Sequence, residues 1–409
     1  MSRRITVQKF GGSSVANTDR INNVAERIIS YLKKGEEIVV VVSAMGDTTD
    51  ELIELAKKIN PHPLEREIDM LISTGEQISS ALLAMALHKR GYEAISFTGL
   101  QVGIITDGSH TRAKIIKINT RRIREELKKG KIVIVAGFQG VNRKKDITTL
   151  GRGGSDLTAI ALAYALDAKI CEIYTDVNGI YTADPRIVPE AKKLKSITYD
   201  EILEMASLGA QVMQARSIEV AKKFNVPIHV RSSFSNEEGT MIVSKTKRLE
   251  EAVITGVTLS KNEAKITIRD VPDRPGIAAK IFGKISDEGI NVDMIVQNVS
   301  KIGTTDLSFT IANSDLSKAI KLAREVSKDI NAGEVSADED IARVSVVGVG
   351  MRTYPGIAAG VFKALAEKKI NIEMISTSDI SISCIVKKNL GEEAVRIIHK
   401  KFKLHKINS

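Results

Sequence analysis

The chain has 409 residues, 43% of them hydrophobic and 27% charged, an ordinary balance for a globular protein of two or three domains. No continuous apolar run is long enough to span a bilayer, so we expect no membrane partner. The net charge of +10 comes from lysines and arginines spread among acidic residues, without any tryptophan, so solvated helix faces explain it at least as well as a nucleic-acid groove, and we expect no nucleic-acid partner.

Strand-like and helix-like segments alternate through the first 232 residues. Residues 5–10 predict a strand, a helix with Ile21, Val24 and Ile28 on one face follows, and apolar runs recur at 36–45, 131–140, 169–179 and 226–233. Continuous β-branched runs are typical of parallel strands buried on both faces. The pattern predicts an α/β fold with a mostly parallel central sheet and helices on both faces. Ligands of such sheets bind beyond the carboxyl ends of the strands.

The first predicted loop, "QKFGGSSVA", combines a charge with two glycines. Gly11 and Gly12 allow a curled backbone whose N–H groups can hold phosphate, and Lys9 places a cation beside it. A glycine pair after a strand is also a common simple turn, so both interpretations stay open. No GxxxxGK[ST] motif occurs, which excludes a P-loop enzyme in its usual form.

The stretch "TTLGRGGSDLTAIALAYAL", residues 148–166, places an arginine among three glycines just before an apolar helix. Arg152 offers a planar fork suited to a carboxylate, and the glycines allow close approach. Ser155 and Asp156 stand at the positive end of the helix dipole. The alternative is that Ser155 or Asp156 is only an N-cap, which leaves the arginine and glycines unexplained.

Further polar residues follow other predicted strands. "YTDVNGIYTADPRI" comes after the strand at 169–175 and is a candidate nucleotide wall, with a double turn as the alternative. Ser43 and Thr49 follow the second strand, and Glu76 opens a helix; taken singly, each is more often a cap than a site.

Several kinds of chemistry have no support. HExxH, CxxC and nucleophile-elbow motifs do not occur, and the six histidines do not cluster. Cys171 and Cys384 lie far apart in apolar strand-like runs, so we expect free thiols in a reducing, cytoplasmic compartment.

The second half contains an internal repeat after a charged, turn-rich linker. Residues 273–300 and 353–380 are identical at ten of 28 aligned positions, and each copy places a Pro-Gly loop before a helix. The helix start offers free N–H groups to a carboxylate. A strand-to-helix turn is the simpler alternative, but two copies with the same returning Asn291 and Asn371 favour a small-ligand site.

These stretches together resemble one family. "VQKFGGSSV", "SAMGDTTDEL", "TTLGRGGSDLTA" and "YTDVNGIYTADPRIV", followed by two Pro-Gly units, are similar to the aspartate kinases with paired ACT domains. The single-function type regulated by lysine, alone or with threonine, is the nearest in pattern. The resemblance implies an amino-acid-kinase catalytic domain at 1–245 and two α+β ACT (ferredoxin-like) domains at 262–340 and 341–409. A strand from 250–261 is a candidate addition to the second ACT domain.

The resemblance also implies the reaction and its residues. ATP with Mg²⁺ would phosphorylate the L-aspartate side chain to 4-phospho-L-aspartate, the first step toward lysine, threonine, methionine and diaminopimelate, with the metal held by ATP and not by the protein. The implied catalytic residues are Lys9, Glu76, Arg152 and Asp156. The implied ATP-binding residues are Lys9, Phe10, Gly11, Gly12, Ser13, Ser43, Thr175, Asp176, Tyr181 and Arg186. The implied aspartate-binding residues are Thr49, Glu76, Arg152, Gly153, Gly154 and Ser155.

The ACT resemblance implies feedback inhibition by lysine, threonine or both, and a homo-oligomer formed through ACT pairing. A shorter ACT-only subunit is an open question. The implied effector residues are Asp273, Gly276, Ala278, Asn291, Val292, Asp293 and Gln297 in the first unit, and Pro355, Ile357, Asn371, Ile372 and Ser378 in the second. A kinase for glutamate and a non-catalytic amino-acid sensor stay as alternatives.

Overall fold

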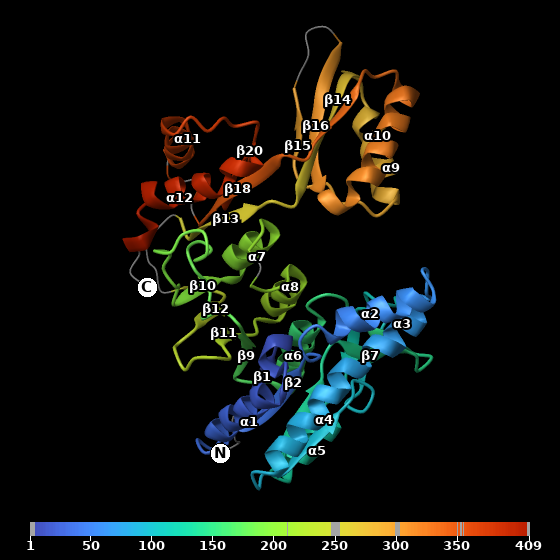
Figure 1. The fold of residues 1–409 in the computed structure, drawn as a ribbon, viewed down its shortest axis with the longest axis vertical. Helices are drawn as coiled ribbons and strands as arrows, with labels where there is room; N and C mark the ends of the chain where they lie inside the picture. The colour runs from blue at the N-terminus through green and yellow to red at the C-terminus, as the bar shows by residue number, and fades with distance from the viewer. Residues whose placement is uncertain are drawn as a thin grey trace.

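The computed structural model describes residues 5–210, 212–246, 254–298, 303–349, 351, 354 and 356–406. Figure 1 shows a large N-terminal body in blue to green, with two smaller units in orange and red beyond it. The large body contains the alternating segments of the first half of the sequence. The smaller units contain the two copies of the repeat.

An eight-stranded sheet forms the centre of the N-terminal body. In spatial order its strands are β10 (Ser196–Thr198), β12 (Thr240–Val243), β11 (Ile228–Ser232), β9 (Ile170–Thr175), β1 (Ile5–Phe10), β2 (Glu37–Val42), β6 (Ile132–Ala136) and β3 (Ala94–Phe97). Every neighbouring pair is parallel except β11 with β12. The predicted mostly parallel sheet is confirmed.

Helices cover both faces of this sheet. One face carries α1 (Thr18–Leu32) and α4 (Thr74–His88). The other face carries α5 (Arg121–Lys128), α6 (Gly154–Leu166), α7 (Tyr199–Ser207) and α8 (Ala215–Phe224). Alternate residues of β2 enter the two cores, Val40 and Val42 on the first face and Val39 and Val41 on the second. Burial on both faces is the physical reason for the continuous valine run.

A smaller sheet and two helices flank the main sheet. Its strands are β5 (Ile115–Ile118), β4 (Ile104–Thr106), β7 (Gln139–Val141) and β8 (Ile147–Thr149), and the helices are α2 (Thr48–Ile59) and α3 (Glu65–Ile72). Strands of three or four residues carry too little alternation for the sequence to predict them.

The helical stretch Glu65–His88 consists of α3 and α4 taken together. Judged only by its length and composition, it is long and apolar enough to cross a membrane. Half of its most apolar window is buried, and α4 packs against α1, β3 and β6. Polar residues interrupt this stretch, so it is not a continuous apolar run. Its packing in the core accounts for its apolar face.

Each repeat unit is a four-stranded antiparallel sheet with two helices, as predicted. The first contains β15 (Ile295–Gln297), β16 (Thr304–Ala312), β14 (Glu263–Pro272) and β17 (Val335–Asp338), with α9 (Ile277–Asp287) and α10 (Leu316–Ile330). The second contains β13 (Gly256–Ser260), β18 (Ile341–Val347), β20 (Ser381–Lys387) and β19 (Met374–Thr377), with α11 (Ile357–Glu367) and α12 (Gly391–Lys401). Short 3₁₀ turns occupy Gly12–Val15 (η1), Asn313–Asp315 (η2), Lys388–Leu390 (η3) and Leu404–Lys406 (η4).

The second unit joins the first unit to the N-terminal body. Arg343 on β18 forms a buried ion pair with Glu263 on β14 at 2.7 Å. The same arginine donates to the Ser207 carbonyl at the end of α7 at 3.3 Å. On the other side, the hydroxyl of Thr182 and Nε2 of His399 lie 2.9 Å apart and are buried. In Figure 1, α7 lies next to β13, which agrees with these contacts.

Candidate functional site

The loops that leave β1, β2 and β9 begin at the same edge of the sheet. Phe10, the last residue of β1, pairs with the last residue of β2 and with Tyr174 of β9. The contacts continue beyond the strands: Ser43 N–H donates to the Phe10 carbonyl at 3.0 Å, and Gly11 N–H donates to the Tyr174 carbonyl at 3.2 Å. The loops that follow these three strands therefore begin side by side.

Lys9 turns away from the α1 core toward α6. Successive residues of a strand point to opposite faces, and the Phe10 ring stacks on Tyr174 in the other core, with centroids 4.7 Å apart. Lys9 Nζ lies 2.6 Å from Asp156 Oδ1, and the two side chains are 12% and 11% exposed. The two side chains therefore form a largely buried ion pair.

The glycine stretch forms the start of α6. Gly151 and Gly153 have φ of 77° and 72°, in the left-handed region that favours glycine. Gly153 is the N-cap of α6 and no side chain caps it, so Ser155 and Asp156 lie inside the first turn. The N-cap interpretation of those two residues is therefore wrong. A Cβ on Gly153 would lie 2.2 Å from Cγ of Gln214, which excludes any larger residue in this conformation.

Arg152 stands free at this turn. Its side chain is exposed. Within the described part of the chain, its guanidinium has neither an ion pair nor a side-chain hydrogen bond. A free guanidinium beside a helix N-terminus is well suited to a carboxylate.

Glu76 is buried in the first turn of α4, with 3% exposure. The Ala44 N–H donates to its Oε1 at 3.2 Å, whereas Oε2 is buried without a hydrogen-bond partner among the described residues. Burial raises the pKa of the Glu76 carboxyl to about 7. The nearby loop is fixed by Ser79, whose hydroxyl donates to the Ser43 carbonyl at 2.6 Å. Thr49, in the first turn of α2, is half-buried.

The residues after β9 that were predicted to bind the nucleotide differ in whether their side chains already have a partner. Thr175 Oγ1 donates to Asp176 at 3.0 Å, and Tyr181 forms an isolated β-bridge with Lys193. The Arg186 guanidinium is committed to Asp184 at 2.7 Å. Arg186 would have to leave this pair to meet a ligand.

Phe10 is fully buried, with its ring in the α1 core and its carbonyl accepting from the Ser43 N–H, so it is not exposed to a ligand. Ser13 is exposed and Ser43 is half-buried.

Two features escaped the sequence analysis. Gly137 follows β6, and a Cβ there would lie 2.8 Å from Ser155 Oγ, so the missing side chain makes room for the start of α6. The hydroxyls of Ser14 and Ser233 lie 2.5 Å apart and join η1 to the segment after β11. A glycine directly after a buried strand was the available signal for Gly137; nothing in the sequence pairs the two serines.

A separate cavity of about 320 Å³ lies at the Pro-Gly loop of the first repeat unit. Asp273, Gly276, Ala278 and Gln297 line it, together with Val271, Arg274, Pro275, Ile277, Ile281 and Leu307. Gly276 is the N-cap of α9 with φ of 91°, so the helix N-terminus opens toward this loop. Asn291, Val292 and Asp293 are not among its lining residues, and Asp293 lies 3.8 Å from Arg343 instead.

The predicted effector residues of the second unit have different surroundings. Ile357 is buried and Ile372 packs on the same core, whereas Asn371 is exposed. Ser378 donates to Glu204 of α7 at 3.1 Å, so it contacts the N-terminal body. Pro355 lies outside the described residues.

Comparison with known proteins shows the family to which the chain belongs. Residues 4–232 match the amino acid kinase family, and residues 269–326 and 344–402 match the ACT domain. An aspartate kinase of Pseudomonas putida is 51% identical over 401 residues, 98% of each chain. An aspartokinase of Corynebacterium glutamicum is 50% identical over 98% of this chain and 96% of that protein.

The chain belongs to the aspartate kinase family.

Solved structures of this family agree with the fold. Escherichia coli aspartokinase III in complex with aspartate and ADP, in its R-state, has a TM-score of 0.81 and 28% identity over 97% of this chain and 99% of that chain. The same enzyme with lysine and aspartate, in its T-state, has a TM-score of 0.77 and 27% identity. Membership of the aspartate kinase family confirms the predicted amino-acid-kinase fold with ACT domains and the class of the enzyme, a phosphotransferase.

The contact between the first two loops leads to a prediction about Gly12. A Cβ on Gly12 would lie 3.0 Å from the carbonyls of both Ala44 and Gly46. Gly12→Ala is therefore expected to push the loops apart and destabilise the fold by ~1–3 kcal/mol, measured by urea unfolding. Gly108→Ala, where no atom lies within 4 Å, is the matched control. Equal stability of the two variants would contradict the close approach.

Proposed function

We propose that this chain transfers the γ-phosphoryl group of ATP to the side-chain carboxylate of L-aspartate. The observation that carries this is the Lys9–Asp156 pair at the sheet edge, between the loop of Gly11 and Gly12 and the glycine stretch before α6. A carboxylate acceptor is ionised at pH 7, with a reference pKa of ~3.9, so the reaction needs no general base. The task of the site is then positioning and neutralising negative charge.

The phosphate end of ATP would lie on the loop after β1. Lys9 would stabilise the charge that moves with the γ-phosphoryl group, and the backbone of Gly11 and Gly12 would hold the phosphates. Asp156 would orient Lys9 and face the hydrated Mg²⁺ of the nucleotide. Mg²⁺ binds mainly through phosphates and water, and among the described residues no group of three His, Cys, Asp or Glu forms a metal site of its own.

The amino acid would lie between Arg152 and Glu76. The free fork of Arg152 suits the α-carboxylate, with the backbone of Gly153 and Gly154 close by. The buried, unpartnered Oε2 of Glu76 suits the ammonium group. Thr49 and Ser155 would complete the pocket.

A glutamate kinase is the nearest alternative, and a non-catalytic sensor is the alternative from another class. Assays of purified protein with ATP and L-aspartate, L-glutamate or N-acetyl-L-glutamate distinguish all three. Turnover of aspartate alone is expected. Turnover of glutamate instead, or no turnover, would overturn the proposal.

The cavity at Asp273 is the proposed effector site, with lysine, threonine or both as ligands. The N-terminus of α9 would bind the α-carboxylate, and Asp273 the ammonium group. The second unit connects to the N-terminal body through Ser378 and Arg343, so a change in how the units pack can reach the kinase body. Pairing of ACT units between copies of the chain would form the proposed homo-oligomer.

Lys9→Ala is expected to lower kcat by ~10²–10³ while KM changes less, because the variant removes a charge from the transferring group. Steady-state kinetics with saturating ATP measure this, and circular dichroism checks folding. Lys57→Ala, an exposed lysine on α2, is the control. Near wild-type kcat in Lys9→Ala would rule out the role.

The KM for aspartate is expected to fall as the pH rises from 6 to 8. Glu76 is largely neutral below its pKa of about 7 and becomes an anion above it, when it attracts the substrate ammonium group. Glu76→Gln should raise KM and abolish the pH dependence. A wild-type KM that is constant over this range, or one that varies equally in the variant, would contradict the assignment.

Asp273→Ala is expected to relieve inhibition by lysine and threonine with little change in uninhibited kcat. Allosteric couplings of ~1–3 kcal/mol are usual, so wild-type inhibition should be several-fold to about a hundredfold. Asp287→Ala, at the other end of α9, is the control of equal charge. If neither amino acid inhibits or binds the wild type, the regulatory proposal fails and the kinase proposal is unaffected.

A further inference from the structure

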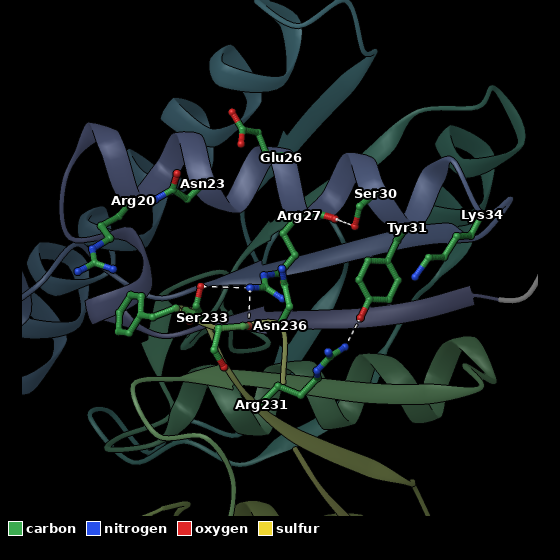
Figure 2. Close-up of a pocket in the computed structure, with 12 residues that line it drawn as sticks. Arg20, Asn23, Glu26, Arg27, Ser30, Tyr31, Lys34, Arg231, Ser233 and Asn236 are labelled. Carbon is green, nitrogen blue, oxygen red and sulfur yellow. Dashed lines mark hydrogen bonds between the residues drawn. The ribbon is translucent and has the colours of Figure 1, made fainter. Parts of the chain in front are cut away.

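A second polar cavity, of about 630 Å³, lies on the opposite face of the sheet from Lys9. One wall is the outward side of α1, and the other is Arg231 of β11 with the segment that follows it. Arg231 pairs in register with Tyr174, whose ring lies in the α1 core, whereas Lys9 faces α6. Figure 2 shows Arg27 and Tyr31 reaching from α1 toward Ser233 and Arg231. This cavity and the candidate active site are therefore different places.

The cavity collects positive charge along one helix face. Arg20 and Arg27 lie seven residues, about two turns, apart on α1 and share one side of the helix, and Lys34 lines the same cavity from the turn that follows the helix. Within the described residues, no carboxylate lies within ion-pair distance of any of the three. The one acid in the lining, Glu26, pairs with Arg90 at 3.3 Å, and Figure 2 shows its carboxylate pointing away from the other side chains.

Arg231 differs from these three cations, because its guanidinium is already paired with a carboxylate. Its guanidinium lies 3.4 Å from Glu172, a buried acid that also accepts hydrogen bonds from Gln8 at 2.9 Å and Tyr31 at 2.8 Å. Burial alone would raise the pKa of Glu172, but its hydrogen bonds and the Arg231 charge lower it to about 2. Glu172 therefore stays an anion whose charge is balanced by Arg231. It does not compensate the charges of Arg20, Arg27 or Lys34.

The free cations are held in place without acids. Arg27 donates to the carbonyls of Ser233 and Ser235 at 3.3 and 2.9 Å. Arg20 stacks on the Phe234 ring at 3.9 Å, and Lys34 lies 5.2 Å from the Tyr31 ring centroid. Carbonyl and aromatic partners orient a cation but leave its charge to attract an anion.

We propose that this cavity binds a phosphorylated small molecule, separately from the active site. Its volume lies within the ~300–1,000 Å³ range of small-molecule sites. Guanidinium groups bind phosphate through paired N–H donors, and two of them stand here with spare donors, next to Asn23 and Ser30 for neutral groups. The proposal does not depend on the kinase reaction.

Calorimetric titration of the full-length protein with pyrophosphate at constant ionic strength tests this. The variants are Arg20→Gln with Lys34→Gln, the matched control Lys33→Gln with Lys57→Gln, and Lys9→Ala. We expect binding to the wild type, the control and Lys9→Ala, and binding at least about tenfold weaker in the Arg20/Lys34 variant. Tenfold corresponds to ~1.4 kcal/mol. Thermal melts verify that each variant is folded.

Three results would overturn the proposal. One is equal affinity of the Arg20/Lys34 variant and its control, which would place pyrophosphate elsewhere. Another is loss of all pyrophosphate binding in Lys9→Ala alone, which would assign the binding to the active site. The third is sulfate binding as tightly as pyrophosphate, which would make the cavity a site for any anion.

Discussion

Parallel pairing of β1 with both β2 and β9 is the constraint on which the candidate active site depends. Because the three strands run in one direction, their carboxyl ends meet at one edge, and the loops that follow are hydrogen-bonded to each other. The pairing also fixes which face each residue of β1 meets. Lys9 is directed to Asp156 on α6, and Phe10 is buried against Tyr174 on the other side.

The same strands separate the proposed ATP site from the proposed site for a phosphorylated small molecule. The Lys9 face of the sheet is closed by α6, whose N-terminus supplies Asp156 and the glycine turn. The α1 face near β9 and β11 carries a cavity instead, lined by Arg20, Arg27 and Lys34, none of which has an ion pair within the described part of the chain. Ser233 connects the two regions, because its N–H donates to the Thr175 carbonyl at 2.9 Å and its hydroxyl lies 2.5 Å from Ser14. A ligand held by Arg27 would therefore contact a segment that also borders the loops of the active site.

The regulatory half is attached through its second unit. β13 comes after the kinase body in the chain and completes the sheet of the second unit by pairing with β18. Arg343 on β18 bonds to the end of α7 and pairs with Glu263 of the first unit, so one buried side chain contacts both neighbours. Removing one member of this buried pair would leave the other charge buried without its partner, so a single substitution at Arg343 or Glu263 would be costly. The cavity at Asp273 lies in the unit beyond it.

The order of strands and helices, the mostly parallel sheet and the duplicated α+β units followed from the sequence, because apolar periodicity and a repeat are local patterns. The loops with Lys9 and Thr175 were recognisable for the same reason, because glycines and charges follow buried strands, and Arg152 was recognisable because it stands among glycines before an apolar helix. The three- and four-residue strands β4, β5, β7 and β8 were not predictable, because so short a segment has no periodicity of its own. The burial of Glu76, which depends on α4 packing against Ala44, and the pairing of Arg186 with Asp184 were not predictable either.

The basic cavity shows most clearly what the sequence alone cannot predict. In the sequence its arginines and lysine are typical of a solvated helix face. Only the tertiary structure places them opposite Arg231, with Glu26 paired to Arg90 and Glu172 paired to Arg231. Sequence determines which charges a helix carries, but the packing of distant segments decides which of those charges keep a partner.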